Sequence, residues 1–461
     1  AHENPQKTIV VDSEGSYTCE QLNLYSNKVA HWLIAKGIPQ DSVIGILVPR
    51  CKEYVSLAMG VLKANCAIVT LEEDYPEERR RQIIREACAK VVLTIDTLKE
   101  ILRSDTDDSD ICLCTIESIF QIFFTSGTTG KPKGVVRTLA EITNDLNILV
   151  TYGLHTQDTA TINVVRFSFV ACIATLWDAI GYGNTIHIIS QDMMSNPEAV
   201  VKYVRENATT YSLMPAGYGA MLVNNYDIPF KDIVLAAEKV LPIKNGNIRV
   251  SNLYASTEVL WIACKVIRSG DTYLTAGVPA AGTQIYILDD NLNPLPQGII
   301  GEICVSSTTM AKGYFNDSEL NARKFVSNPF ISGKMMYRTG DLGYLDEAGE
   351  LNVVGRIDNM VKLRGFRIEL DEITFTAMKC RGIDMCACTK VAKGGSEALC
   401  CYYTSTAGLQ EDALQEYLSK RLPPYMVPDI YMLLDRMPLN ANGKIDRNIL
   451  IKEGINKAVL L

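Results

Sequence analysis

The sequence predicts an α/β protein with a large N-terminal domain of stacked mixed or parallel sheets and helices, a small antiparallel subdomain, and a small α+β C-terminal domain. Three observations carry this prediction. At 461 residues the chain is too long for a single core, which suggests two or three domains. Short apolar runs alternate with amphipathic stretches through the first half. Farther on, the expected strands shorten and turn signals become frequent.

The individual elements follow from periodicity and end signals. Residues 18–37 are expected to form a helix, because Thr18 and Gln21 make a Thr-x-x-Gln start and Gly37 is a typical stop. Between 273 and 305, turn signals such as Asp289-Asp-Asn predict the antiparallel region. Short apolar runs predict buried strands at 43–48, 67–71, 91–95, 119–124, 185–189, 209–213 and 233–236.

Composition excludes several classes of protein. An apolar content of 47% and a charged content of 21% are those of an ordinary soluble globular protein. The net charge of −8 argues against nucleic-acid or anionic-membrane partners. No membrane span is expected, because Lys63 and Asn65 interrupt the most apolar stretch, and no signal peptide is expected before Thr8. The chain is therefore expected to be cytoplasmic.

The fourteen cysteines and four histidines offer little sign of a metal cluster. The closely spaced cysteine pairs lack the C-x2-C spacing of a zinc site. We expect these cysteines to be free thiols packed in the core of a protein from a reducing compartment.

Residues 124–134 read Phe-Thr-Ser-Gly-Thr-Thr-Gly-Lys-Pro-Lys-Gly and follow a predicted strand. Glycine lets a backbone curl close to phosphate oxygens, and the hydroxyl and ammonium groups suit a small anion. Only two residues separate Gly127 from Gly130, and Lys131 precedes proline, so this is not a Walker loop. A flexible hairpin tip is the alternative for such a loop taken alone.

Four more motifs follow in order: Asn-Leu-Tyr-Ala-Ser-Thr-Glu at 252–258, Tyr-Arg-Thr-Gly-Asp-Leu at 337–342, the Gly-Arg-Ile-Asp segment at 355–369, and Asn-Gly-Lys-Ile-Asp-Arg at 442–447. Together they resemble the signature set of the adenylate-forming enzymes. The resemblance is greatest to adenylation domains of nonribosomal peptide synthetases, for which Leu-Pro-Pro-Tyr-Met-Val-Pro at 422–428 is also typical. It runs from about residue 8 to 447.

The resemblance implies a two-step reaction. A carboxylate attacks the α-phosphate of ATP to give acyl-AMP and pyrophosphate, and a thiol then displaces AMP. It also implies a core domain of residues 1–357 that holds ATP and the acyl group, and a small mobile domain of 358–461 that carries a catalytic lysine, with a hinge at Asp358. The expected partners are a small carboxylic acid, a carrier-protein domain whose phosphopantetheine thiol accepts the acyl group, and neighbouring synthetase domains.

Residue roles follow from the resemblance. Lys444 would stabilise the transition state between carboxylate and α-phosphate, and Glu258, beside Thr257, would bind Mg2+ through hard carboxylate oxygen. Tyr254 would stack on adenine and Asp341 would accept the ribose hydroxyls. The full set expected around ATP or AMP is Thr125, Ser126, Gly127, Thr128, Thr129, Gly130, Lys133, Asn252, Tyr254, Asp341, Arg356 and Lys362. The alternatives are a solvated loop glutamate for Glu258, a packed core tyrosine for Tyr254 and a surface lysine for Lys444.

Three departures from the family pattern stand out. Ala255 and Ser256 replace the Gly-Pro that normally follows the stacking tyrosine. Val353 stands where an aromatic residue is usual, and the span 238–252 is shorter than typical. None of the three removes a charged catalytic group.

The expected acyl pocket departs in a more informative way. Adenylation domains for α-amino acids carry an aspartate after the second phenylalanine of the segment at 167–170, and here that position is Val170. A buried ammonium without a partner costs several kcal/mol, so the substrate is expected to be an α-keto or hydroxy acid, an aryl acid or an aliphatic acid. A β-amino acid stays open. The predicted lining is Val170, Ala171, Ala174, Ala216, Val234, Ala236, Leu253, Trp261 and Ile262.

Two other functions would fit part of the same sequence evidence. A free-standing acyl-CoA or aryl-CoA ligase would use the same ATP chemistry with another thiol. A catalytically silent acyl-binding domain would keep the fold without turnover. The retention of Lys444, Glu258, Asp341 and Lys133 argues against a silent domain.

Overall fold

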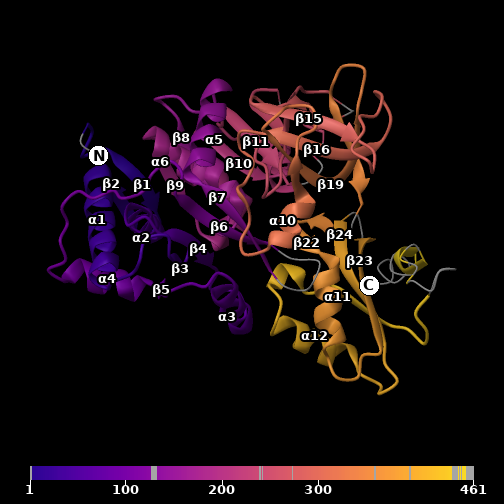
Figure 1. Cartoon of the computed structure of the whole chain (residues 1–461). Coiled ribbons are helices and arrows are strands. Elements are labelled where there is room, and N and C mark those ends of the chain that lie inside the picture. The colour runs from indigo at the N-terminus through magenta and orange to yellow at the C-terminus, as the bar shows by residue number, and fades with distance from the viewer. Residues whose placement is uncertain are drawn as a thin grey trace. The chain divides into compact units, whose positions relative to one another are not determined.

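The computed structural model describes residues 3–125, 132–237, 240, 242–244, 246–271, 274–357, 360–393, 396–438, 445, 447 and 449–452 (Figure 1). Its backbone forms two compact units. The first comprises Ala1–Glu73, Ala87–Phe124 and Gly134–Ile357, and the second comprises Asp74–Glu86, Thr125–Lys133 and Asp358–Leu461. The second unit thus combines the C-terminal residues with two short segments from the first third of the chain.

A nine-stranded mixed sheet forms one layer of the first unit. Its order is β14-β13-β12-β11-β10-β8-β9-β1-β2, and the strands from β12 to β1 run parallel to their neighbours, while the pairs at both ends are antiparallel. The bounds are β1 Thr8–Asp12, β2 Gly15–Thr18, β8 Ala160–Asn163, β9 Thr185–Ile188, β10 Tyr211–Pro215, β11 Asp232–Ala236, β12 Arg249–Tyr254, β13 Ala263–Ile267 and β14 Val278–Pro279.

A six-stranded sheet in the first unit is also largely parallel and has the strand order β17-β7-β6-β4-β3-β5. The pairs β3/β4, β3/β5 and β4/β6 are parallel and β17/β7 is antiparallel. Its bounds are β3 Val43–Leu47, β4 Ala67–Leu71, β5 Val91–Leu93, β6 Ile119–Thr125, β7 Lys133–Thr138 and β17 Gly313–Tyr314. Residues of both sheets, such as Val10, Ile44 and Leu213, belong to one large apolar core.

Helices connect these strands. The predicted first helix is confirmed as α1, Cys19–Ala35, where Thr18 and Gln21 form a reciprocal capping box. Helices α1, α2 and α4 pack side by side (Figure 1). The other helices of this part of the chain are α2 Lys52–Lys63, α3 Glu77–Glu86, α4 Ile95–Arg103, α5 Leu139–Thr151, α6 Asp178–Tyr182, α7 Gln191–Met194, α8 Pro197–Glu206 and α9 Ala216–Asn225.

The predicted antiparallel region is confirmed as a five-stranded sheet at the end of the first unit, with order β15-β16-β19-β18 and β20 paired to β19. Its strands are short, apart from β19, and turns connect them, so each pairs locally with its neighbours. The bounds are β15 Thr283–Leu288, β16 Gly301–Ser307, α10 Ser318–Lys324, β18 Phe325–Ser327, β19 Met335–Leu345 and β20 Leu351–Arg356.

The C-terminal part of the second unit has the α+β character that the sequence predicts. A three-stranded sheet has the order β23-β24-β25, with β23/β24 antiparallel and β24/β25 parallel. Helices α11 and α12 cover one face, and alternate residues of the strands form a separate apolar cluster on the other. The bounds are β21 Met360–Leu363, β22 Phe366–Glu369, α11 Leu370–Met378, β23 Met385–Lys393, β24 Ser396–Thr404, α12 Glu411–Ser419 and β25 Ile430–Leu433.

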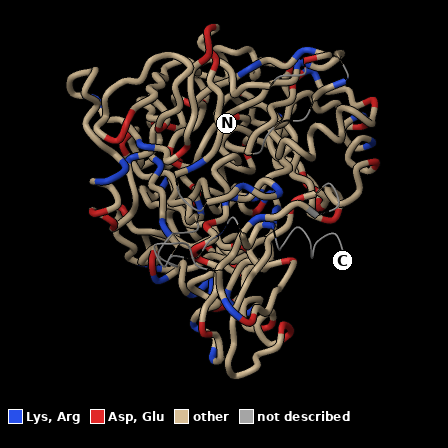
Figure 2. The backbone as a smooth tube through the Cα atoms, turned by 90° about the vertical axis from the view of Figure 1, so that its right-hand side faces the viewer, with Lys and Arg blue, Asp and Glu red and all other residues tan. Residues whose placement is uncertain are grey.

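Charged residues are spread along the backbone, with Lys and Arg interspersed among Asp and Glu (Figure 2). This mixing fits the modest net charge of −8. Among the described residues, no helix combines the length and the apolar character needed to cross a membrane.

Candidate adenylate-forming site

Three of the residues predicted to bind the nucleotide meet around one carboxylate in the first unit. Tyr254 ends β12, and its hydroxyl donates a hydrogen bond to Asp341 on β19. Arg356 ends β20 directly opposite Asp341 in the strand register and forms an ion pair with the same carboxylate. The structure therefore brings together residues that are separated by about a hundred positions in the sequence.

The surroundings of this carboxylate keep it in place. Asp341 is 6% exposed, and its backbone N–H donates to Thr339 Oγ1 at 2.9 Å. Arg356 also donates to the Thr339 carbonyl at 3.3 Å, so its guanidinium bridges backbone and carboxylate. Burial, followed by the Asp341 charge, raises the pKa of Tyr254 well above its usual value, which keeps the phenol a hydrogen-bond donor.

Glu258 is completely buried, in contrast to a solvated loop glutamate. Its carboxylate accepts a hydrogen bond of 2.7 Å from the Tyr314 hydroxyl, which lies 3.4 Å from the hydroxyl of Tyr337. The Ala311 N–H donates to the Glu258 carbonyl at 2.7 Å and fixes the backbone. A buried carboxylate needs donors or a cation, and its hard oxygens are those that Mg2+ prefers.

The residues next to Glu258 form a tight turn. Ser256 and Val259 are linked in both directions, because Val259 N–H donates to Ser256 Oγ at 3.1 Å and Ser256 N–H donates to the Val259 carbonyl at 2.9 Å. Half-buried Thr257 lies inside this turn. Ser256, one of the departures from the family pattern, thus holds the loop that presents Glu258.

Asn252 lies two residues before Tyr254 on β12, and therefore on the same side of the sheet. Its amide donates to the Thr275 carbonyl at 2.8 Å. The Thr275 hydroxyl in turn donates to Glu350 at 2.7 Å. These bonds connect the end of β12 to the start of β20.

The remaining predicted nucleotide residues belong to the second unit or lie outside the described residues. Thr125 ends β6, and its hydroxyl faces the Lys133 carbonyl at 3.5 Å. The Lys133 ammonium lies 3.2 Å from the carboxylate of Glu369, which is 1% exposed. Lys362 is opposite Arg367 in the β21/β22 pair. Outside the described residues are Ser126, Gly127, Thr128, Thr129, Gly130, Asp358 and Lys444.

All but one of the predicted acyl-pocket residues belong to the large core of the first unit. Ala236 and Leu253 are neighbours across β11 and β12, and Val170 lies half-buried in a short 3-10 turn, Val170–Cys172. Trp261 is 1% exposed and packs against Tyr152 at a ring distance of 5.7 Å. Ile262 lies instead in a neighbouring apolar cluster with Val259 and Tyr337.

Sequence reasoning missed two buried acids near this region. Asp145 on α5 and Asp178 on α6 are both at most 1% exposed, and their carboxyl groups interact with each other and, for Asp145, with Trp261. Burial raises the pKa of Asp145 to about 6, while burial and the Asp145 charge raise the pKa of Asp178 well above its usual value. The pair therefore shares a proton.

A buried arginine lies near both sets of acids. Arg137 is fully buried, donates to the Thr309 carbonyl at 2.5 Å and pairs with Glu141 at 3.3 Å. Burial lowers the pKa of Arg137, and the charges of Glu141, Asp145 and Glu258 oppose that shift. No sequence pattern marks this group, since Arg137 lies on β7 whereas Glu141 and Asp145 lie on α5, among polar residues such as Thr143 and Asn144.

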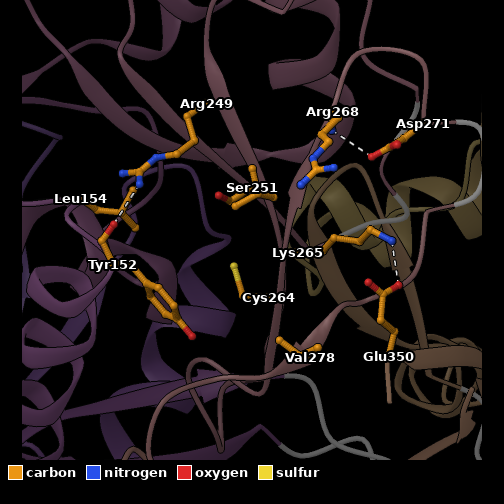
Figure 3. A pocket seen from close by; sticks show the side chains of 11 residues that line it. Tyr152, Leu154, Arg249, Ser251, Cys264, Lys265, Arg268, Asp271, Val278 and Glu350 are labelled. Atoms are coloured by element: carbon orange, nitrogen blue, oxygen red, sulfur yellow. Dashed lines mark hydrogen bonds and ion pairs between the residues drawn. The ribbon is translucent and has the colours of Figure 1, made fainter. Parts of the chain in front are cut away.

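A cavity of about 510 Å³ opens beside β12 and β13 in the first unit (Figure 3). None of the predicted acyl-pocket residues lines it, although Tyr152 contributes to its wall and packs on Trp261. Two cations in the wall have side-chain contacts: Lys265 pairs with Glu350 at 2.7 Å, and Arg249 donates to the Tyr152 carbonyl at 3.0 Å. The cavity is thus a mixed polar and apolar hollow next to the predicted pocket.

Comparison with known proteins identifies the family. The model of the AMP-binding enzyme family matches residues 1–315, and that of the AMP-binding enzyme C-terminal domain matches 376–444. The chain therefore belongs to the AMP-binding enzymes. This membership confirms the prediction of an adenylate-forming acid–AMP ligase, and it implies the use of ATP.

Among curated proteins, bacitracin synthase 3 of Bacillus licheniformis and tyrocidine synthase 2 of Brevibacillus parabrevis are each 33% identical over 98% of this chain. The chain spans only 7% and 13% of their respective lengths. These relatives confirm the resemblance to the adenylation domains of nonribosomal peptide synthetases.

Solved structures share the fold. The o-succinylbenzoate CoA synthetase of Bacillus subtilis superposes with a TM-score of 0.88 at 20% identity, covering 98% of this chain and 96% of that one. An artificially fused adenylation–PCP di-domain protein from Klebsiella oxytoca has a TM-score of 0.82 at 19% identity, covering 93% and 91%. The predicted fold class is confirmed by these likenesses.

Proposed function

We propose that this chain activates a carboxylic acid as acyl-AMP, releasing pyrophosphate, and passes the acyl group to the phosphopantetheine thiol of a carrier protein within a nonribosomal peptide synthetase. The observation that carries the proposal is the convergence of Tyr254 and Arg356 on the Asp341 carboxylate, with buried Glu258 in the same unit. The synthases named above, of which this chain spans a small part, and the adenylation–PCP di-domain structure support the choice of acceptor.

In this proposal each residue has a separate task. Asp341 accepts the ribose hydroxyls, and its anchoring by a phenol and a guanidinium means that little reorganisation is needed on binding. Glu258 would hold Mg2+, which screens charge on the phosphates when it is bound. Lys444 would stabilise the negative charge that develops at the α-phosphate, delivered by the domain of residues 358–461 turning about Asp358.

The proposed substrate has no charge at its α carbon. Val170 stands half-buried among apolar residues, and an α-ammonium placed there would lose its hydration and find no carboxylate at that position. The two buried acids of the same core, Asp145 and Asp178, come from α5 and α6 and not from the position that Val170 occupies.

The test is ATP–pyrophosphate exchange with pairs of acids that differ only at the α position, such as a branched α-keto acid and its amino acid, together with benzoate-type and short aliphatic acids. The uncharged acid should be preferred by roughly 100-fold, and Val170→Asp should shift the preference toward the amino acid. Lys444→Ala is the inactive control for this assay, because pyrophosphate exchange should vanish in it while ATP still binds.

Two outcomes would change the conclusion. Faster turnover of a common L-α-amino acid than of every uncharged acid would reject the proposed substrate class and leave the adenylation chemistry standing. Thioester formation on coenzyme A but not on a phosphopantetheinylated carrier would replace the proposed acceptor and identify a CoA ligase.

A further inference from the structure

Three cysteines that are scattered in the sequence meet inside the C-terminal sheet. Cys386 and Cys388 are two positions apart on β23, and Cys401 on β24 is directly opposite Cys388 in the antiparallel register. Side chains two apart on one strand, and directly opposite on the next, point to the same face of a sheet. All three thiols therefore point into the core beneath α11 and α12.

The distances among the sulfur atoms are those of a metal site. The Sγ atoms of Cys386 and Cys401 are 3.5 Å apart, and all three Sγ atoms lie within 4.8 Å of one another. With metal–sulfur bonds of about 2.3 Å, thiolates around a tetrahedral zinc ion lie about 3.8 Å apart. Placing an ion among the three sulfur atoms would change the distances between them by no more than about 1 Å.

Burial favours a tightly held ion over an adventitious one. Cys386 is 3% exposed and the other two thiols are fully buried, so a bound ion would be shielded from bulk solvent. Soft thiolate sulfur selects zinc and copper(I) rather than the hard Mg2+ of the nucleotide chemistry. The sequence gives no hint of this cluster, because zinc-site patterns rely on cysteines spaced along the chain, whereas the strand register creates this one.

We propose that Cys386, Cys388 and Cys401 form a three-thiolate site for a soft metal ion, with zinc as the expected occupant. The three thiols lose their protons to water and bind the ion as thiolates, so binding releases up to three protons and weakens as the pH falls. The ion joins β23 to β24 inside the C-terminal sheet. Its role is structural and separate from the acyl-AMP chemistry, so the proposal is independent of the proposed function.

The experiment measures metal content. The whole chain is produced in cells grown with added zinc, purified under reducing conditions without chelator, and analysed for zinc per chain. The expected result is about one ion per chain. Exchange of zinc for Cd2+ should then produce a thiolate-to-cadmium charge-transfer absorption that corresponds to one cadmium ion per chain. In a second measurement, the Tm of the zinc-loaded chain should exceed the Tm of chain made in zinc-depleted medium.

The chain supplies matched controls. Cys400 neighbours Cys401 but points into the opposite core of the sheet, so Cys400→Ser should keep the ion whereas Cys401→Ser should lose it. Cys112 and Cys114 have sulfur atoms 3.4 Å apart, with Cys112 exposed, and their double replacement by serine tests for adventitious binding at a two-thiol surface site. That double variant should also retain the ion.

Three results would overturn the proposal. The first is wild-type chain with no zinc and no Cd2+ absorption, which needs no variant to interpret and leaves the cysteines as ordinary core thiols. The second is metal that persists in Cys401→Ser. The third is a chain mass under non-reducing conditions that is two hydrogens lower than that of the reduced chain, with a disulfide between Cys401 and Cys386 or Cys388. That result would identify a redox pair.

Discussion

Two pairs of buried carboxylates in the first unit show how partners decide what a buried acid can do. Glu258 and Asp341 each accept a hydrogen bond from a tyrosine hydroxyl, and Asp341 also pairs with Arg356. Asp145 and Asp178 are as deeply buried, but they interact with each other, and the contact of Asp145 with Trp261 offsets less of the pKa shift than burial imposes. Donors favour the ionised form and burial alone favours the neutral form.

This difference in hydrogen-bond partners indicates which buried acids can bind a ligand and which affect stability. An ionised carboxylate held by fixed donors can bind a cation or the hydroxyls of a sugar without rearrangement. Two carboxyls that share a proton are instead a source of pH-dependent stability, since the second charge can form only against the first. The following substitutions test this division by removing one acid at a time.

The largest effect is expected at Glu258. Replacing it with Gln keeps the shape and the contact with Tyr314 but removes the charge that would hold Mg2+. Pyrophosphate exchange should fall by about 100-fold or more, with an increased requirement for Mg2+. Initial rates measured across a range of Mg2+ concentrations would show this.

The matched control is Asp12→Asn. Asp12 is a buried carboxylate, 8% exposed and paired with Lys52, on a strand at the other end of the nine-stranded sheet. Its loss should lower stability with little change in exchange. Equal losses of exchange in both variants would mean that burial of a charge, rather than its position, explains the effect at Glu258.

A smaller effect is expected at Asp341. Asp341→Asn should raise the KM for ATP by about 10-fold and change kcat less, because the carboxylate is assigned to ground-state binding of the ribose. Tyr254→Phe, which removes only the hydroxyl donor to Asp341, should raise the KM by a smaller factor. An unchanged KM for ATP in Asp341→Asn would remove this residue from the nucleotide site.

The sequence predicted one side of this comparison and not the other. Tyr254, Asp341 and Arg356 occur in short motifs that resemble those of the adenylate-forming enzymes, so the resemblance suggested roles for them before their contacts were known. Asp145 lies in a helix whose charged residues look the same whether they face solvent or the core. Only the packing of α5 against the turn at Ile173–Trp177 and α6 shows which of the two applies.

Two further features were beyond sequence reasoning for related reasons. The burial of Glu258 depends on Tyr314, which comes from a strand more than fifty residues away. The association of segments 74–86 and 125–133 with the C-terminal unit depends on long-range contacts such as Arg79 to Glu372, at 2.6 Å. Local patterns predict elements well, whereas such contacts require the register and packing of distant parts of the chain.

The smallest effect, and one of opposite sign, is expected at Asp178. The pKa of Asp145 is about 6 in the folded chain and 3.8 without perturbation, so its contribution to stability is complete below about pH 4 and is lost as the pH rises through 6. Asp178→Asn removes the repulsion between the two acids and offers Asn donors to Asp145. The variant should therefore be more stable than the wild type by about 1 kcal/mol at pH 8, with a smaller difference at pH 5.

Urea unfolding at both pH values measures this difference in stability. The control, Asp12→Asn, should be less stable than the wild type at pH 8, because the Asp12 carboxylate is paired with Lys52. If Asp178→Asn were instead destabilised at pH 8, the two acids would have to be held by partners such as buried water, and the proposed distinction between the two pairs of carboxylates would fail.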